Sequence, residues 1–125
     1  MEYKFTIPLR PITKKNSQRI IKDGSGRSRI IPSAAYKKYE KQCKAYMPRI
    51  ENIKYPVNVK AVYYMPNRRR VDLTNLHEAL HDILVDHEVL ADDDYKTIAS
   101  TDGSYVDVDK WGPRTEVTIT ELVTG

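Results

Sequence analysis

The chain has 125 residues, of which 40% are hydrophobic, so it is long enough for one domain with a hydrophobic core and too short for two. Its single cysteine excludes an intrachain disulfide framework. The net charge of +4 conceals a division, because 18 of the 21 lysines and arginines precede Val71 and 13 of the 17 acidic residues follow Arg70. Such a division is typical of a surface that binds phosphates beside one that holds divalent cations, although an ordinary solvated surface with uneven charge is the alternative.

The cellular location is predicted from what the sequence lacks. No apolar run approaches the roughly 18 residues that a membrane helix needs. The start, Met1 to Lys4, has no charged leader followed by an apolar segment of signal-peptide length. We therefore expect a cytoplasmic protein whose residues 1–125 form one domain.

The first third of the chain predicts a strand and then a basic hairpin arm. Tyr3 to Ile7 alternates as a short strand that ends at Pro8. Two isoleucine pairs, Ile20-Ile21 and Ile30-Ile31, flank the turn residues 23–26. Basic residues lie on and just before this arm: Lys14, Lys15, Arg19, Lys22, Arg27 and Arg29. We expect the arm to follow a nucleic-acid backbone, although a surface loop kept soluble by its charge explains the pattern equally well.

A helix is predicted from Ser33, which can cap free backbone N–H groups, to Pro48. Its two faces differ in character: Tyr36, Tyr39, Cys43 and Met47 share one, and Lys37, Lys38, Lys41 and Lys44 share the other. The tyrosines are interpreted as core residues and not as platforms for stacking bases, because they form the helix's only apolar stripe.

The second half predicts three strands and a second helix. The strands are Val57 to Met65, Tyr95 to Ala99 and Thr115 to Leu122, the last two joined through a polar turn at 102–104 and an irregular stretch at 111–113. The second helix begins near Leu73 or Thr74, and its apolar stripe comprises Leu73, Leu76, Leu80, Ile83 and Leu84. Its opposite face carries Asn75, Glu78 and Asp82. The expected fold is α+β, with a small mixed or mainly antiparallel sheet and two helices on one face.

The stretch from Arg68 to Asp94 carries the strongest chemical signal. Three consecutive arginines precede Asp72, and the acidic run 92–94 follows the second helix. Paired carboxylates 4 Å apart repel by about 4 kcal/mol at an effective dielectric near 20, so a buried group of them needs protons, cations or metal ions. Arginine forks, meanwhile, match phosphate oxygens. The pattern predicts a metal-dependent enzyme that acts on a polyanion.

A second motif points to a different enzyme. His77 to His81 reads H-E-x-x-H, in which two histidines one turn apart bind zinc and Glu78 polarises water. The longer form of this motif needs glycine where Leu84 stands, so that the chain returns His87 to the metal. On an unbroken helix the three imidazoles do not converge. We therefore expect His77 and His81 to be two exposed helix residues and treat a zinc hydrolase as the weaker hypothesis.

The central block resembles a known family. It consists of Met65 to Leu76, then Ala79, Leu80, Asp82 and Leu84, then Leu90 to Asp93. This block is similar to that of the RusA-type Holliday-junction resolvases, and weaker similarity extends to the opening strand, Asn16, the helix from Ser33 and the closing strand. The resemblance implies a homodimeric, Mg²⁺-dependent endonuclease, with Mn²⁺ as a substitute, that cuts four-way junction DNA by paired nicks in recombination and repair and is usually encoded by phages or prophages.

The resemblance also implies site residues. Asp72 and Asp93 match two of the family's catalytic aspartates, whereas Thr74 and Glu78 stand where the family has an aspartate and a lysine. We hypothesise that Glu78 restores the missing carboxylate, so that Asp72, Glu78 and Asp93 bind Mg²⁺, and that Thr74 caps the helix or holds a metal-bound water. The simpler interpretation of Asp72 is a helix N-terminal acid, and Asp92 and Asp94 are expected to be solvated.

The expected contacts with DNA follow from charge. Residues predicted to hold phosphates near the site are Arg68, Arg69, Arg70 and Lys96, with Lys14, Lys15 and Arg19 on the arm. The substitutions at Thr74 and Glu78 also leave a competing hypothesis open, a protein that binds four-way junctions without cutting them.

Overall fold

The computed structural model describes residues 1–14, 18–22, 24, 26 and 28–122, and only the backbone path at 18–22 and 28–32. The elements in chain order are β1 (Glu2–Ile7), β2 (Gln18–Lys22), β3 (Ser28–Pro32), α1 (Ala34–Cys43), η2 (Lys44–Tyr46), β4 (Val57–Met65), α2 (Leu73–Asp86), β5 (Ile98–Ser100), β6 (Tyr105–Val108) and β7 (Arg114–Glu121). Neither described helix combines the length and the apolar character needed to cross a bilayer.

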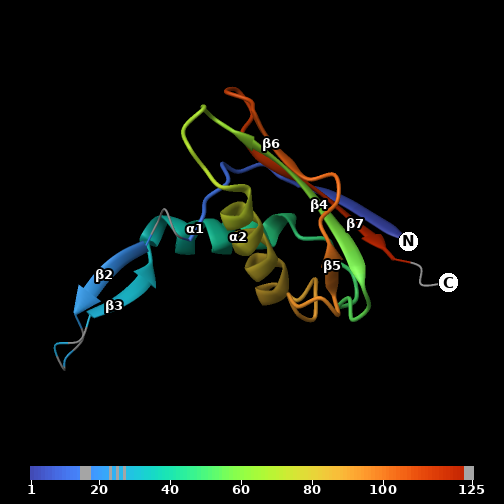
Figure 1. The fold of residues 1–125 in the computed structure, drawn as a ribbon, viewed down its shortest axis with the longest axis horizontal. Helices are drawn as coiled ribbons and strands as arrows, with labels where there is room; N and C mark the ends of the chain where they lie inside the picture. The colour runs from blue at the N-terminus through green and yellow to red at the C-terminus, as the bar shows by residue number, and fades with distance from the viewer. Residues whose placement is uncertain (15–17, 23, 25, 27, 123–125) are drawn as a thin grey trace.

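The main sheet is mixed. Its strand order is β1-β7-β4-β5, and β6 also pairs with β4. β7 runs antiparallel to both β1 and β4, whereas β5 and β6 are parallel to β4, β5 near its start and β6 along its end. Both helices lie on the same side of this sheet (Figure 1), which confirms the predicted small α+β domain with a mixed sheet.

The core lies between the sheet and the helices. The strand register aligns Phe5, Val117 and Ala61 across three strands, and Ile7, Thr115 and Tyr63 in the row two residues away. Alternation of side chains along a strand therefore directs one face of all three strands toward the helices. The helices contribute buried side chains as predicted: Tyr36, Tyr39 and Cys43 from α1, and Leu76, Leu80, Ile83 and Leu84 from α2. Each buried aliphatic side chain contributes roughly 1.5–3 kcal/mol.

α1 begins as predicted and ends earlier. The Ser33 hydroxyl accepts a hydrogen bond from the Tyr36 backbone N–H at 3.2 Å, which is the expected N-cap. The α-helix stops at Cys43 and tightens into η2, so the predicted continuation to Pro48 is wrong in its last turn. The Cys43 side chain is fully buried, and this burial raises the pKa of its thiol to about 11.

Two features of the second half differ from the prediction. The strand expected at Tyr95 to Ala99 starts three residues later, because the Asp94 carbonyl accepts the N–H groups of Thr97 and Ile98 and holds 94–98 in a turn. The short strand β6 was not expected, and it forms where 105–108 pairs with the end of β4.

The predicted hairpin arm is confirmed in its backbone. β2 and β3 pair antiparallel with Ile20 opposite Ile30 and form a separate two-stranded sheet. The arm extends away from the main sheet (Figure 1). Lys15 lies outside the described residues, as does the side chain of Arg19, so the predicted phosphate contacts of these two residues stay predictions.

Candidate functional site

The three consecutive arginines lie on the surface loop that joins β4 to α2. Arg68, Arg69 and Arg70 are all exposed. Arg70 Nε lies 3.9 Å from Asp72 Oδ1, and 93% of the Arg70 side chain is exposed. A surface pair of this kind contributes little to stability. The guanidinium groups are therefore available to phosphate oxygens at small energetic cost.

A cleft of about 410 Å³ opens beside this loop. It is bounded on one side by the segment after β1 and on the other by the β4–α2 loop; its lining comprises Arg10, Pro11, Ile12, Thr13, Ala35, Met65, Asn67, Arg69, Arg70 and Val71. Among these described residues the charged ones are three arginines. The cleft is therefore electropositive and suits a segment of a polyanion.

Asp72 occupies the N-cap position of α2. Its backbone carbonyl accepts the N–H groups of Asn75 and Leu76, each at 3.1 Å, so the residue starts the helix as predicted. Its carboxylate makes no capping hydrogen bond and stays exposed, with Asn75 Nδ2 3.5 Å from Oδ2. The Asp72 carboxylate therefore does not serve as a side-chain N-cap and contacts only the Asn75 amide in the first turn. Thr74 is exposed in the first turn.

An acidic face runs along α2 with carboxylates four residues apart at Glu78, Asp82 and Asp86. The Lys14 ammonium donates a hydrogen bond to Asp82 and lies 5.7 Å from the centre of the Tyr36 ring. Burial acts to lower the pKa of Lys14, but the hydrogen bond and charge of Asp82, with the charges of Asp86 and Glu78, outweigh it and raise that pKa. Lys14 therefore stays protonated and ties the root of the basic arm to this face.

α2 ends at Asp86 in a Schellman motif, and the acidic run begins six residues later, at Asp92. The Val89 N–H binds the Leu84 carbonyl at 2.9 Å, and the Glu88 N–H binds the Val85 carbonyl at 3.0 Å. Glu88 has φ of 62°, the left-handed conformation in which glycine is usual. Val89 and Leu84 are both buried. This turn leads the acidic run back alongside α2.

The acidic run places Asp93 near Asp82, a carboxylate on α2. Asp93 is exposed, and its pKa is raised, first by a side-chain hydrogen bond with Asp92 and also by burial and by the charges of Asp82 and Asp92. Asp94 has a structural role, because its Oδ1 accepts the Lys96 N–H at 3.0 Å. Asp93, after the end of α2, and Asp82, on the helix, therefore lie close enough for the charge of one to act on the other.

The histidines of the H-E-x-x-H motif contribute to packing. The Tyr63 hydroxyl and His77 Nδ1 are hydrogen-bonded at 2.8 Å, and the His77 and His81 rings stack with centroids 5.4 Å apart. Both are half-buried, so the prediction of two exposed residues is wrong. His87 Nε2 donates to the Glu40 carbonyl at 2.8 Å, which turns it toward α1. Leu84 is buried in the continuing helix, as the argument against a zinc hydrolase required.

The lowered pKa of the half-buried His81 predicts acid sensitivity. Burial, followed by the charge of His77, lowers the pKa of His81 to about 4. The unfolded chain then binds this proton more tightly than the folded one, so stability falls as the pH drops from about 6.5 toward 4. Between pH 7 and pH 5, the free energy of unfolding should fall by about 1–2 kcal/mol more in wild type than in His81→Gln. Urea unfolding in EDTA at the two pH values measures it. His87→Gln is the control, and equal losses in wild type and His81→Gln would contradict the assignment.

Within the described part of the chain, no three histidine, cysteine, aspartate or glutamate side chains are grouped so as to hold a metal ion. A zinc site of three or four protein ligands does not fit this arrangement. Hard carboxylate oxygens at Asp72, Glu78 and Asp93 do suit Mg²⁺, which proteins commonly bind through one or two carboxylates together with substrate phosphates. The residue types therefore suit Mg²⁺, but these three carboxylates do not form a group that could hold the ion without DNA.

Asp82 was missed as a site residue from the sequence. It was placed on the same helix face as Glu78 but not in the site, although the i, i+4 spacing was the available signal. Lys14 was predicted to bind DNA; it pairs with Asp82, and its contact with DNA stays a prediction. Lys96 is exposed beside the acidic run, and its role as a phosphate contact stays a prediction.

Comparison with known proteins finds one family model that matches most of the chain. The model of the family described as Endodeoxyribonuclease RusA matches residues 8–120. The match spans the arginine loop, α2 and the acidic run. A search of curated proteins gave no match.

Proposed function

This chain belongs to the RusA endodeoxyribonuclease family, a family of enzymes, and we propose that it is a Mg²⁺-dependent nuclease that resolves four-way DNA junctions by paired nicks. One observation carries the proposal. An exposed arginine loop and an arginine-lined cleft directly adjoin Asp72, at the start of the helix whose acidic face is electrostatically linked to Asp93. A polyanion drawn to the arginines is thereby brought beside carboxylates.

The arginines bind and orient the DNA backbone. Arg69 and Arg70 line the cleft, and each presents a planar fork of donors that matches two phosphate oxygens at once. Phosphate contacts set the position of the DNA and carry no sequence information. Recognition of a junction therefore depends on its shape and charge.

Carboxylates hold the cation. Asp72 and Asp93 are the proposed principal ligands, with Glu78 as the third and Thr74 as a second oxygen donor at the helix start. A bound Mg²⁺ supplies Lewis-acid stabilisation of the charge that develops on the phosphodiester oxygens, and Mn²⁺ can replace it. The pKa of Asp93 is raised first by a side-chain hydrogen bond with Asp92, then by burial and by the charges of Asp82 and Asp92, and a cation bound nearby would favour the ionised carboxylate.

Lys14 and Asp82 are proposed positioning residues. Their ion pair gives the acidic face one fixed positive charge next to Asp82, whose own charge acts on Asp93. Where the family has a lysine, this chain has Glu78, and Lys14 supplies an ammonium to the same helix face from the N-terminal segment.

A homodimer is part of the proposal. Symmetric nicks in two strands need two active sites related by a two-fold axis, which matches the symmetry of a four-way junction. The second candidate function is a protein that binds junctions and does not cut them. Two departures from the family pattern favour this second function. Thr74 stands in place of an aspartate, and Glu78 stands in place of a lysine and so reverses the charge there.

One experiment separates these functions. Purified protein is incubated with a labelled synthetic four-way junction in Mg²⁺ or in EDTA, and with a linear duplex of the same arm sequence. We expect paired symmetric nicks in the junction with Mg²⁺ only, and no cutting of the duplex. Retarded but intact junctions in Mg²⁺ would support the binder, and cleavage of a peptide on addition of zinc would support the hydrolase.

A further inference from the structure

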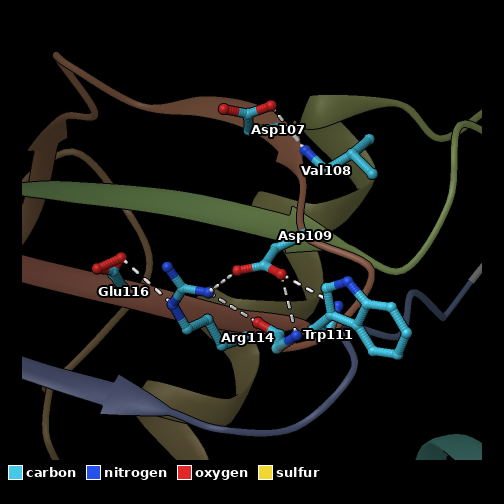
Figure 2. Close-up of polar contacts among 7 residues, drawn as sticks. Asp107, Val108, Asp109, Trp111, Arg114 and Glu116 are labelled. Carbon is cyan, nitrogen blue, oxygen red and sulfur yellow. Dashed lines mark hydrogen bonds and ion pairs between the residues drawn. The ribbon is translucent and has the colours of Figure 1, made fainter.

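A cross-linked turn connects β6 to β7. Asp109 Oδ1 accepts the backbone N–H groups of Trp111 and Gly112, each at 3.1 Å, and Oδ2 accepts Arg114 Nη1 at 2.7 Å (Figure 2). Arg114 Nη1 also donates to the Gly112 carbonyl at 2.8 Å. One carboxylate and one guanidinium thus bind each other and three backbone groups of the turn. The turn is held by its own interactions and needs no partner to form.

The turn is anchored to the sheet beneath it. The Arg114 guanidinium lies 3.9 Å from the centre of the Tyr64 ring, and its Nε is 3.5 Å from Glu116 Oε2. The Asp109 N–H donates to the Met65 carbonyl at 2.9 Å. These contacts fix the base of the turn against β4 and β7.

This fixed turn holds a tryptophan in solvent. Trp111 is 89% exposed, the most exposed large hydrophobic residue in the described part of the chain. Its indole points away from the Asp109–Arg114 network (Figure 2), and Lys110 Nζ lies 5.1 Å from its ring centre. A single exposed apolar residue is common. An indole presented by a preorganised turn beside a lysine has, in addition, the geometry of a binding contact.

The position of the turn indicates what binds there. β6 ends at Val108, paired with Met65, so the turn adjoins the start of the loop that carries Arg68 to Arg70. The turn and that loop lie at the same end of the sheet (Figure 1). Cations on both sides attract phosphates and would be costly to desolvate in an apolar protein interface. Because Arg114 pairs with Asp109 and Glu116, the cations that remain for a partner are Lys110 and the arginine loop, and these favour phosphates.

We infer that Trp111 stacks on a DNA base at the exchange point of the junction, with Lys110 on the adjoining phosphate. This inference rests on the proposed function. Continuous duplex hides the faces of its bases, whereas base stacking is interrupted where strands exchange, and an indole can cover an exposed base face there. Stacking of this kind depends little on sequence, in keeping with recognition of shape.

The test uses the fluorescence of Trp111, which is the only tryptophan of the chain. Full-length protein is titrated in EDTA with a synthetic four-way junction, with linear duplex of the same arm sequence, and with heparin, a polyanion without bases. We expect strong quenching by the junction and weak quenching by duplex and heparin. Trp111→Ala should weaken junction binding about 5- to 150-fold, and Trp111→Phe should retain most of the affinity.

The outcomes distinguish this inference from the proposed function. If wild type binds the junction with unchanged fluorescence and Trp111→Ala binds equally well, the stacking contact is excluded and the nuclease proposal stands. If heparin quenches as strongly as the junction, the signal is electrostatic and the inference is overturned. If Trp111→Ala instead changes the sedimentation of the DNA-free protein, the indole contacts a second copy of the chain. Failure of wild type to bind the junction would overturn both proposals.

Discussion

Asp72→Asn and Asp93→Asn are each expected to lower the rate of junction cleavage at least about a hundredfold in Mg²⁺. Asparagine keeps the shape of the side chain and removes the charge that holds the cation. Losing about 3 kcal/mol of transition-state stabilisation corresponds to that factor. Binding of the junction in EDTA should be unchanged or slightly tighter, because one negative charge near the phosphates is removed.

The cleavage rate is measured by single-turnover cleavage of a labelled junction. Binding is measured by a gel-shift assay in EDTA. Glu78→Gln belongs in the same series and is expected to abolish cleavage if Glu78 replaces the family's missing carboxylate. Asp102→Asn is the matched control, an exposed acid in the turn between β5 and β6. Full activity of either Asp72→Asn or Asp93→Asn would remove that residue from the site, and full activity of Glu78→Gln would reject its compensating role.

Replacing Arg68, Arg69 and Arg70 together by alanine is expected to weaken junction binding on the order of a hundredfold at 0.1 M salt. Each neutralised phosphate contributes about 0.9 to the slope of log affinity against log salt, so three lost contacts reduce that slope by roughly 2.7. The three side chains are exposed, and the fold should keep its stability.

Fluorescence anisotropy across a series of salt concentrations measures both the junction affinity and its salt slope. The control removes an equal charge elsewhere, from Lys37, Lys38 and Lys41 on the exposed face of α1. If both triple variants lose the same affinity and slope, net charge alone governs binding and the arginine loop has no special place in it. A selective loss in the arginine variant locates the phosphate contacts beside Asp72.

The sequence predicted those elements whose apolar residues recur at a regular spacing. The apolar residues of α2 recur at helical spacing, and the predicted stripe residues Leu76, Leu80, Ile83 and Leu84 are buried. β6 was missed because three of its four residues are exposed and its pairing with β4 joins segments some forty residues apart. Nothing local in 105–108 signals that pairing.

The candidate site was predictable in its residue types and not in its connections. The Schellman turn after α2 has Glu88 where glycine is the usual signal, so the return of the acidic run toward Asp82 had no marker in the sequence. The two histidines were expected to be exposed because helix geometry argued against a zinc site and nothing local indicated a packing partner. Their packing depends on Tyr63, which the sheet brings beneath α2.

The buried thiol of α1 has a practical consequence for following this protein on DNA. Maleimides and oxidants react with accessible thiolates, and Cys43 is buried with a raised pKa, so it is inert to both in the folded state. It is also the chain's only cysteine. A cysteine introduced at any exposed position is therefore labelled selectively in the otherwise native protein, and distances between dye pairs become measurable without first altering the core.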